Sequence, residues 1–253
     1  MPRFFIQKKP AVGDSIVIEG EDAHHIARSL RMAVGEEITL CDPEGCEYAS
    51  VIRDFLDDKQ VTVEILSVAE RTNESPLQIV LYQALPKGDK MDSVIQKAVE
   101  CGVHAIVPFE SSRCVVRMKA DAEARKTERR TRIAAEAAKQ SGRSVLPVVY
   151  PTVSFNEMLE RAKGGDLCLF CYEGEGTAPL GAVLPKLYPI LKKGERPLVN
   201  VIVGSEGGFS QEEVRAAEAR GMVAVGLGKR ILRTETASSF VLACLCYATE
   251  LQP

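Results

Sequence analysis

Two glycine-rich junctions near the end of the chain constrain its fold more than any other feature. In the first, the apolar and β-branched run 198–203 leads into Gly204-Ser205-Glu206-Gly207-Gly208-Phe209. The next four residues, Ser210-Gln211-Glu212-Glu213, have the pattern of a capping box. This segment therefore predicts a buried strand, a glycine turn and a helix in direct succession.

A second junction of the same kind follows. The apolar run 222–226 predicts a short buried strand, and the segment Leu227-Gly228-Lys229-Arg230-Ile231-Leu232-Arg233 supplies a glycine turn and three cations. A helix is predicted next, capped by Thr234 or Thr236 and running through Leu245. The two junctions together predict parallel strands whose carboxyl ends face the same way.

Parallel sheets bind ligands at the carboxyl ends of their strands, where glycine lets the backbone approach a ligand closely. Tight turns alone would explain the glycines of either junction, but the pair favours a ligand-binding edge. Neither junction has the G-x-G-x-x-G spacing of dinucleotide sites, and no Lys-Ser or Lys-Thr follows a glycine loop as a P-loop requires. A dinucleotide or a nucleoside triphosphate is therefore disfavoured.

The chain divides at a polar segment, 71–76, that ends in Pro76. Before it, short runs rich in Val, Ile and Thr predict the strands of a small β-barrel, at 15–18, 37–41, 47–55 and 60–66, with one helix at 21–30. After it, strands and helices alternate, which predicts a parallel sheet covered by helices. Besides the two junctions, we expect strands at 77–85, 105–109 and 167–172 and helices at 91–101 and 120–140. The expected domains are residues 1–72 and 73–253.

The composition is that of an ordinary globular chain, with 45% hydrophobic and 26% charged residues. No apolar run reaches the roughly 18 residues needed to span a bilayer, and the first residues lack the apolar core of a signal peptide. We therefore expect no membrane association and a cytoplasmic location.

The spacing of the eight cysteines argues against a metal site. Cys168 and Cys171 form a C-x-x-C pair, but on a strand positions three apart point to opposite faces. Cys244 and Cys246 diverge on a helix in the same way. Cys41 and Cys46 flank a turn, and the chain has no second cysteine pair with the spacing that a metal site would need. Reduced, buried thiols are the expected state.

Basic residues concentrate in one segment. Residues 1–75 contain 8 Lys and Arg and 15 Asp and Glu, whereas residues 113–143 contain 10 Lys and Arg and 4 acidic residues. Arg125, Arg129 and Arg132 follow helical spacing in that segment, so contact with phosphate groups is one interpretation. A solvated helix face is the other, and the charge alone does not separate the two.

Five motifs in this order resemble the RsmE-type ribosomal RNA uridine methyltransferases of the SPOUT superfamily over nearly the whole chain. They are Asp22-Ala23-His24-His25-Ile26-Ala27-Arg28-Ser29-Leu30-Arg31, residues 87–92 with 96–103, residues 136–143, and the two glycine junctions. Ser205 stands where the family usually has proline, and Arg130 where it often has an aromatic residue. We expect Ser205 to loosen its loop and Arg130 to alter contact with RNA.

The resemblance implies a small N-terminal PUA-like β-barrel that holds RNA, followed by a SPOUT-type α/β domain with a C-terminal trefoil knot that pairs as a homodimer. It also implies the activity: transfer of a methyl group from S-adenosylmethionine to ring nitrogen 3 of one uridine in 16S ribosomal RNA, with the RNA or the small ribosomal subunit as partner. Two alternatives remain at this point, a non-catalytic RNA-binding assembly factor and a SPOUT methyltransferase acting on another RNA position.

The resemblance assigns the cofactor to the two glycine junctions, with one further residue from the loop after the earlier strand. Methylation of a uracil imide needs a proton acceptor or a cation that stabilises charge on the carbonyl oxygens. Arg233 and Glu235 are the candidates, although Arg233 could instead bridge two subunits and Glu235 could merely balance a helix dipole. The expected cofactor residues are Glu173, Gly204, Glu206, Gly207, Gly208, Leu227, Gly228, Ile231, Leu232 and Thr236.

RNA contacts are expected from the first motif and from the basic segment. The histidines of the first motif could equally be packed, His104 is expected to be structural, and the residues near 140 could instead cap the basic helix. The expected RNA-binding residues are His24, Arg28, Arg31, Arg113, Arg129, Arg132, Gln140 and Arg143.

Overall fold

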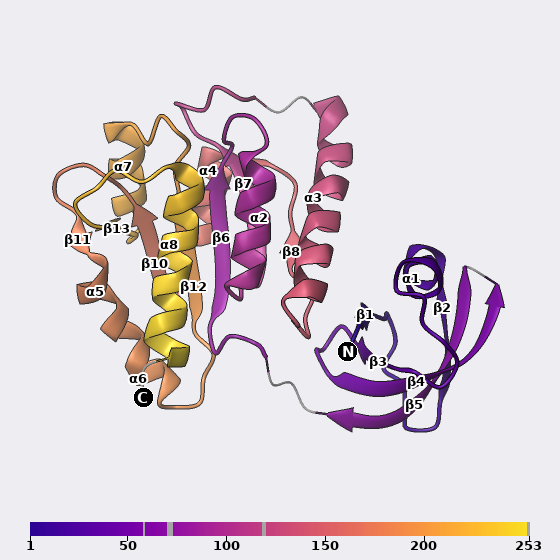
Figure 1. The fold of residues 1–253 in the computed structure, drawn as a ribbon. Coiled ribbons are helices and arrows are strands. Elements are labelled where there is room, and N and C mark those ends of the chain that lie inside the picture. The colour runs from indigo at the N-terminus through magenta and orange to yellow at the C-terminus, as the bar shows by residue number, and fades with distance from the viewer. Residues whose placement is uncertain (58, 70–72, 118–119, 252–253) are drawn as a thin grey trace. The chain divides into compact units, whose positions relative to one another are not determined.

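The computed structural model describes residues 1–57, 59–69, 73–117 and 120–251 (Figure 1). The chain forms two compact units. The first contains the chain up to Glu74 together with Ala138–Leu146, and the second contains Ser75–Ala137 and the chain from Pro147 onward. The division falls in the polar segment expected from the sequence, where Arg71 and Thr72 lie outside the described residues. The segment 138–146 was expected in the second domain but groups with the first unit.

The first unit is built on one five-stranded sheet. Its order is β1-β3-β4-β5-β2, and all neighbours are antiparallel except β1 and β3. The sequence predicted four of the strands; β1 was missed because three residues carry too short a pattern. No ladder joins the edge strands β1 and β2 among the described residues, so the sheet is open where a barrel was predicted. The strands are β1 (Arg3–Phe5), β2 (Ser15–Glu19), β3 (Glu37–Cys41), β4 (Glu47–Asp57) and β5 (Gln60–Ala69).

The core of this unit follows the alternation of its strands. Along β5, Val61, Val63 and Ile65 are buried while the residues between them are only partly buried, as the period of two requires. The predicted helix at 21–30 exists as α1 (Gly20–His24) continued by a π-helical turn (His25–Ser29), and it places Ile26 in the same core.

The second unit contains one parallel sheet, as predicted. Its order is β11-β13-β10-β12-β6-β7-β8, with β9 paired to β7, and every ladder is parallel. The strands are β6 (Gln78–Ala84), β7 (Ala105–Glu110), β8 (Val148–Val149), β9 (Val153–Ser154), β10 (Leu167–Cys171), β11 (Ala178–Pro179), β12 (Leu198–Val203) and β13 (Val223–Gly226).

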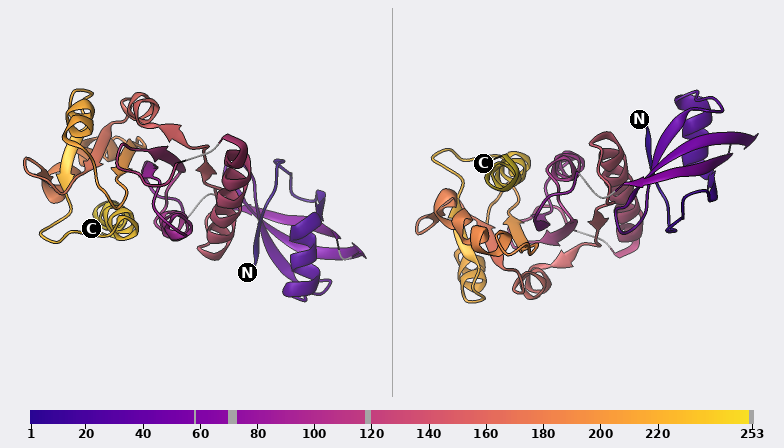
Figure 2. Two further views of the ribbon diagram at one scale, coloured as in Figure 1. Left: turned by 90° about the horizontal axis from the view of Figure 1, so that it is seen from above. Right: turned by 90° about the horizontal axis from the view of Figure 1, so that it is seen from below.

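Helices lie on both faces of this sheet (Figure 2). Helices α2 and α8 pack against each other in front of the sheet in Figure 1, with α8 against β12, while α4 contacts β7 and α7 contacts β13. The sequence analysis missed α4 and the short turns after β11. The helices are α2 (Lys90–Glu100), α3 (Ala120–Gln140), α4 (Phe155–Ala162), α5 (Leu180–Val183), a 3₁₀ turn (Leu184–Leu187), α6 (Tyr188–Leu191), α7 (Gln211–Glu218), α8 (Thr234–Cys246) and a π-helical turn (Tyr247–Leu251).

The two helix starts at the glycine junctions differ from each other. The predicted capping box is confirmed for α7, because the Ser210 hydroxyl accepts from the amide of Glu213 and the Glu213 carboxylate accepts from the amide of Ser210. The predicted threonine cap of α8 is wrong. The N-cap of α8 is Arg233, with no side-chain capping bond, and the Thr234 hydroxyl donates to the Gly204 carbonyl at 2.6 Å instead.

Aromatic packing anchors the first glycine loop. Phe209, the last residue of that loop, is buried, and its ring centroid lies 4.2 Å from Phe170 on β10 and 6.3 Å from Phe109 on β7. A ring of this size contributes about 3 kcal/mol or more to core packing. Phe209 therefore fixes the end of the loop to the packed aromatic core, and this keeps the glycines of the loop in place.

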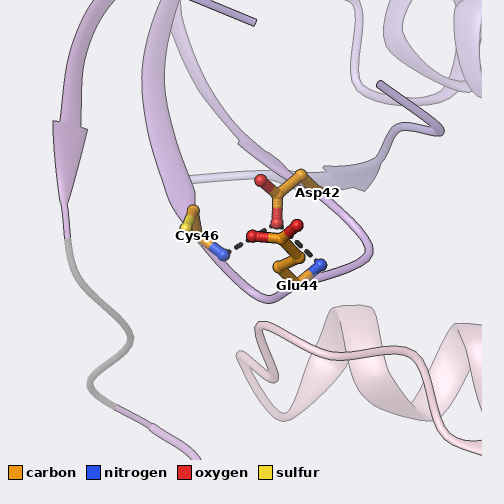
Figure 3. Close-up of side chains that lie close together, drawn as sticks. All are labelled: Asp42, Glu44 and Cys46. Carbon is orange, nitrogen blue, oxygen red and sulfur yellow. Dashed lines mark hydrogen bonds between the residues drawn. The ribbon is translucent and has the colours of Figure 1, made fainter. Parts of the chain in front are cut away.

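All eight cysteines are free thiols, and Cys168 and Cys171 lie on β10 as predicted. Cysteine spacing alone does not reveal a cluster of carboxylates with a thiol. In the structure, Asp42, Glu44 and Cys46 bring their ligand atoms within 4.8 Å of one another (Figure 3). One Asp42 oxygen accepts from the amides of Glu44 and Cys46 at 2.9 Å each, and the other accepts from the Tyr48 hydroxyl at 2.8 Å. The Asp42 carboxylate thus stabilises the turn between β3 and β4.

No helix formed by the described residues combines the length and the apolar character that a bilayer crossing requires.

Candidate functional site

Three loops meet at the carboxyl edge of the second unit's sheet. Strand β10 lies between β12 and β13, with Cys171 opposite Val203 on one side and Val225 on the other. The loops that follow these strands therefore leave the sheet at the same level. They enclose a cavity of about 410 Å³, within the range of roughly 300–1,000 Å³ for small-molecule sites.

Most of the residues assigned to the cofactor line this cavity. Gly207 and Thr236 do not. A Cβ atom on Gly207 would lie 2.9 Å from the Cβ of Arg113, so glycine is needed there to pack against the loop after β7. Thr236 is exposed on α8. The residues that do line the cavity are Glu173, Gly204, Glu206, Gly208, Leu227, Gly228, Ile231 and Leu232.

Gly208 combines a left-handed backbone with a close side-chain neighbour. Its φ is +61°, and a Cβ atom there would lie 2.4 Å from Glu173 Oε1. The amide of Gly208 donates to the Ser205 carbonyl at 2.9 Å and closes the turn. That bond involves only the backbone of residue 205, so the loosening expected from the serine side chain stays a prediction. The Ser205 hydroxyl is buried beside the cavity and has no hydrogen-bond partner among the described residues.

A buried amide ties the two junctions to each other. Gln83, at the end of β6, donates from Nε2 to the Thr234 hydroxyl at 2.9 Å, and Thr234 donates to the Gly204 carbonyl. The sequence analysis missed Gln83 because a single polar residue at the end of an apolar strand carries no motif. The tie makes the position of the second loop depend on the first.

Lys90 was also missed as a site residue, although it lies in one of the motifs. Its ammonium donates to Glu206 Oε1 at 2.8 Å and lies 3.7 Å from Glu235 Oε2. Burial by itself would raise the pKa of Glu206, but hydrogen bonds from Lys90 and from the Lys87 amide outweigh it and lower the pKa below its ordinary value. The hydrogen bond to Glu206 raises the pKa of Lys90. Both groups are therefore charged at neutral pH.

The structure separates the two catalytic candidates. Arg233 is exposed and lines the cavity, so its guanidinium can reach a group bound there. Glu235 lies in the first turn of α8, where a carboxylate also balances the helix dipole. It does not line the cavity but faces Lys90.

The RNA-binding candidates of the second unit are mostly exposed. Arg113 donates to the Gly207 carbonyl at 3.1 Å, Arg129 is paired with Asp92, and Arg132 is exposed on α3.

Arg130, which stands where the resembled family often has an aromatic residue, was expected to alter contact with RNA, but its surroundings indicate another role. Its side chain is buried, donates to Thr152 Oγ1 at 3.1 Å and lies 3.6 Å from Glu123, so its role is in packing.

The first unit contains the remaining candidates. His24, Arg28 and Arg31 are exposed on and after the helical turn, with Arg31 in the left-handed region at φ 53°, and Gln140 is exposed at the end of α3. Arg143 is different. Its side chain is 4% exposed and donates from Nε and Nη2 to the equally buried Glu74, at 3.1 and 2.7 Å. The expected RNA contact of Arg143 is therefore replaced by an internal ion pair.

This ion pair leads to a stability prediction. Replacing Glu74 with glutamine removes the carboxylate that pairs with the buried Arg143 guanidinium, and we expect the free energy of unfolding to fall by about 3–5 kcal/mol. Chemical denaturation monitored by circular dichroism measures the change. A control, Glu64→Gln, removes an exposed pair with Arg53 and should change the free energy by less than about 1 kcal/mol. Equal effects of the two substitutions would contradict the prediction.

The same pair predicts a pH dependence. Burial alone would raise the pKa of Glu74, but the hydrogen bonds and charge of Arg143 and the amides of Ser144 and Val145 lower it below its ordinary 4.5. A carboxyl group whose pKa is lower in the folded state stabilises that state above the unfolded value, and the stabilisation is lost as the pH falls. We expect the stability gap between the parent protein and Glu74→Gln to be constant near neutral pH and to shrink below about pH 4.5.

Comparison with known proteins gives consistent matches over the whole chain. The RNA methyltransferase domain family matches residues 73–246, and the RNA methyltransferase PUA domain family matches residues 18–66. The ribosomal RNA small subunit methyltransferase E of Bacillus subtilis is 35% identical over 254 residues, which cover 99% of this chain and 98% of the relative. The protein of the same name from Synechocystis is 30% identical, with coverages of 95% and 76%.

Solved structures show the same similarity. A putative methyltransferase from Legionella pneumophila, in complex with the bound cofactor SAM, is 33% identical with a TM-score of 0.85 and covers 97% of both chains. A ribosomal RNA small subunit methyltransferase E from Neisseria gonorrhoeae, bound to S-adenosyl methionine, is 32% identical with a TM-score of 0.84 and the same coverages. The similarity extends over both units.

Proposed function

The chain belongs to the RNA methyltransferase family whose curated members are named ribosomal RNA small subunit methyltransferase E, and we propose that it methylates ring nitrogen 3 of one uridine in 16S ribosomal RNA with S-adenosylmethionine as methyl donor. The single observation that supports this most directly is the glycine-lined cavity at the carboxyl edge of the sheet. Because the proposed substrate is ribosomal RNA, we expect the protein to act in the cytoplasm.

The cavity fits the cofactor in size and in chemistry. Its volume suits a nucleoside with an amino-acid side arm, and its glycines expose backbone groups that can pair with a base. The buried Ser205 hydroxyl needs a partner that a polar ligand would provide. We assign the cofactor to the lining residues of the two glycine loops and to Glu173, and we assign a supporting role to Gly207 and Thr236. When bound, the cofactor supplies a methyl group attached to a sulfonium ion.

Arg233 and Glu235 are the residues that we assign to the chemistry. Uracil nitrogen 3 carries a proton and is a weak nucleophile until that proton is removed or the charge that develops on the carbonyl oxygens is stabilised. The exposed Arg233 guanidinium at the cavity can donate to such an oxygen. Glu235 lies beside the cavity and can accept the proton. Holding both groups close to the methyl carbon converts the reaction into an intramolecular one.

Each unit by itself carries candidates for RNA contact. The first, with residues 1–72 as its core, is the PUA-like RNA-holding unit, and the second, from residue 73, is the methyltransferase unit. Internal pairing removes Arg143 from the RNA-contacting set and assigns it to stabilising the segment 138–146. The exposed residues remain as candidates: His24, Arg28, Arg31, Arg113, Arg129, Arg132 and Gln140.

A trefoil knot is the proposed path of the last strands. Strand β13 pairs with the outer side of β10, yet α8 returns to pack against α2 and β12. We propose that the segment 227–233 passes through the connection between β10 and β12, and this strand order is compatible with such a path. General topology rules disfavour such a crossing, so the support comes from this strand order and from the family. An experimental density map that traces 227–233 on the solvent side of 172–197 would exclude the knot.

A homodimer is the proposed assembly. Helix α8 and the turn after it expose Phe240 (42%), Tyr247 (57%) and Leu251 (71%). Phe240 and Tyr247 line an apolar groove of about 760 Å³ that shares Leu227 and Gly228 with the cofactor cavity. A second copy covering this groove would remove the apolar side chains from water and enclose the cavity.

The dimer can be tested by one charge substitution. Light scattering is expected to give twice the chain mass of 27.6 kDa for the parent protein and the monomer mass for Tyr247→Glu, because a buried unpaired carboxylate costs several kcal/mol. The matched control is Tyr150→Glu, an exposed tyrosine that does not line the groove, and it should leave the dimer mass unchanged. A monomeric parent protein at 100 μM would overturn the dimer.

Calorimetric titration with S-adenosylhomocysteine tests the function without any RNA. Saturable binding at one site per chain, followed by transfer of labelled methyl groups to small ribosomal subunits, is the expected result. Digestion of the product to nucleosides then identifies the methylated position, and a methyl group on a ribose or another base would assign the enzyme to a different SPOUT reaction. Absence of binding at millimolar ligand would instead favour the non-catalytic assembly factor.

A further inference from the structure

The loop after β7, residues 111–117, packs directly on the first glycine loop. Arg113 donates from Nη1 to the Gly207 carbonyl at 3.1 Å. A Cβ atom on Gly207 would lie 2.9 Å from the Arg113 Cβ and 3.0 Å from the Arg113 carbonyl oxygen, so the two backbones are in contact. The contact leaves no room for a side chain at position 207, and it places the Arg113 guanidinium on the glycine loop.

The loop after β7 is itself fixed in position. The buried Glu213 carboxylate accepts from the Ser112 amide at 2.7 Å and from the Ser210 amide at 2.9 Å, so one side chain ties this loop to the start of α7. At the base of the loop, Ser111 and Cys114 are buried, and the Cys114 amide donates to the Ser111 carbonyl at 3.2 Å. Packing and hydrogen bonds therefore define where the guanidinium of residue 113 starts from.

The bond from Arg113 fixes one peptide plane of the glycine loop. The peptide between Gly207 and Gly208 carries the Gly207 carbonyl and the Gly208 amide, which point in opposite directions in a trans peptide. The carbonyl accepts from Arg113, and the amide donates to the Ser205 carbonyl at 2.9 Å. Glycine restricts the backbone least of all residues, so a peptide between two glycines needs partners to hold one orientation. Arg113 supplies one of the two partners.

This peptide forms part of the wall of the cofactor cavity. Glu206 and Gly208 line the cavity, whereas Gly207 and Arg113 do not. The Lys90 ammonium holds Glu206 from the start of α2, at 2.8 Å. The glycine loop is therefore held at two successive residues, and Arg113 acts on the cavity wall from outside the cavity.

We infer that Arg113 is a positioning residue for the cofactor site, whose guanidinium holds the Gly207–Gly208 peptide in the orientation that receives S-adenosylmethionine. The inference rests on the proposed function. It adds to the RNA contact proposed for Arg113, because a guanidinium has five N–H donors and the side chain is exposed. RNA contact alone predicts no effect of Arg113 on cofactor binding when RNA is absent, so RNA-free protein separates the two roles.

The test is calorimetric titration of the RNA-free protein with S-adenosylhomocysteine. In Arg113→Met the aliphatic stem is kept and the donor is lost, and we expect the affinity to fall about three- to tenfold, the usual effect of losing one hydrogen bond. Arg113→Lys keeps a donor for the same carbonyl and should recover most of the affinity. The melting temperature of the unliganded protein should change by less than about 2 °C, because residue 113 is exposed.

The matched control is Arg215→Met, which removes an exposed arginine from α7 and should leave the affinity unchanged. Unchanged affinity in Arg113→Met would overturn the inference and leave Arg113 with RNA contact only. An affinity loss that Arg113→Lys does not restore would overturn it as well. Failure of the parent protein to bind S-adenosylhomocysteine would instead reject the proposed function.

Discussion

Replacing Arg233 with alanine is expected to slow methyl transfer by about 10²–10³-fold, the usual effect of removing one donor to a developing oxyanion. Affinity for S-adenosylhomocysteine should change by less than about threefold, because that ligand does not develop the charge. The physical basis is the exposed guanidinium at the cavity lining. Single-turnover assays with small ribosomal subunits measure the rate, and calorimetry measures the affinity.

Two controls separate the roles that Arg233 can have. Arg215→Ala removes an exposed arginine from α7 and should leave the rate within about twofold. Light scattering on Arg233→Ala shows whether the dimer persists, since a salt bridge between subunits would produce a slow enzyme by dissociating it. A dimeric variant with an unchanged rate would remove Arg233 from the mechanism.

Replacing Gly208 with alanine is expected to weaken S-adenosylhomocysteine binding at least tenfold. Two costs combine at this position. A left-handed backbone with a Cβ atom costs about 1–2 kcal/mol, and that Cβ would meet Glu173 Oε1 at 2.4 Å. The Glu173 side chain must therefore move away, and the part of the cavity wall that it forms moves with it. Calorimetric titration of the variant measures the effect.

The clash and the backbone strain can be measured separately. Gly208→Ala introduced into a Glu173→Ala background meets no clash, so the affinity that it costs there is the backbone cost, and it should be smaller than the loss in the parent protein. Gly164→Ala is the control, because a Cβ there meets nothing within 4 Å and its φ is not in the left-handed region. If Gly208→Ala bound the ligand as the parent protein does, the assignment of this loop to the cofactor would be wrong.

Local patterns predicted most of the fold. The alternation along β5, the apolar runs of β10 and β12 and the capping box of α7 are all properties of neighbouring residues, and each was found where expected. Elements of two to four residues, such as β1, β8 and α5, were missed because so short a segment cannot show a hydrophobic period. The α8 cap was wrong because Thr234 bonds the Gly204 carbonyl, a partner far along the chain.

The site residues also fall into two groups, those that local sequence patterns predict and those that they do not. Glycine loops signal their function locally, since a positive φ and a bare backbone face need glycine whatever lies around them, as at Gly208. Side-chain roles depended on partners that the sequence does not place. Arg143 is matched by Glu74, Gly207 by Arg113, and Lys90 by Glu206 and Glu235.

The sequence by itself determined the class of fold, the order of most of its longer strands and helices, the family and the loops that form the cavity. Hydrophobic period, turn chemistry and motif spacing are short-range properties. Only the tertiary structure decided which charges are buried in pairs and which are exposed at the surface. Those outcomes depend on distances between residues up to 145 positions apart, such as Lys90 and Glu235, and electrostatic energy depends on such distances and on burial rather than on order along the chain.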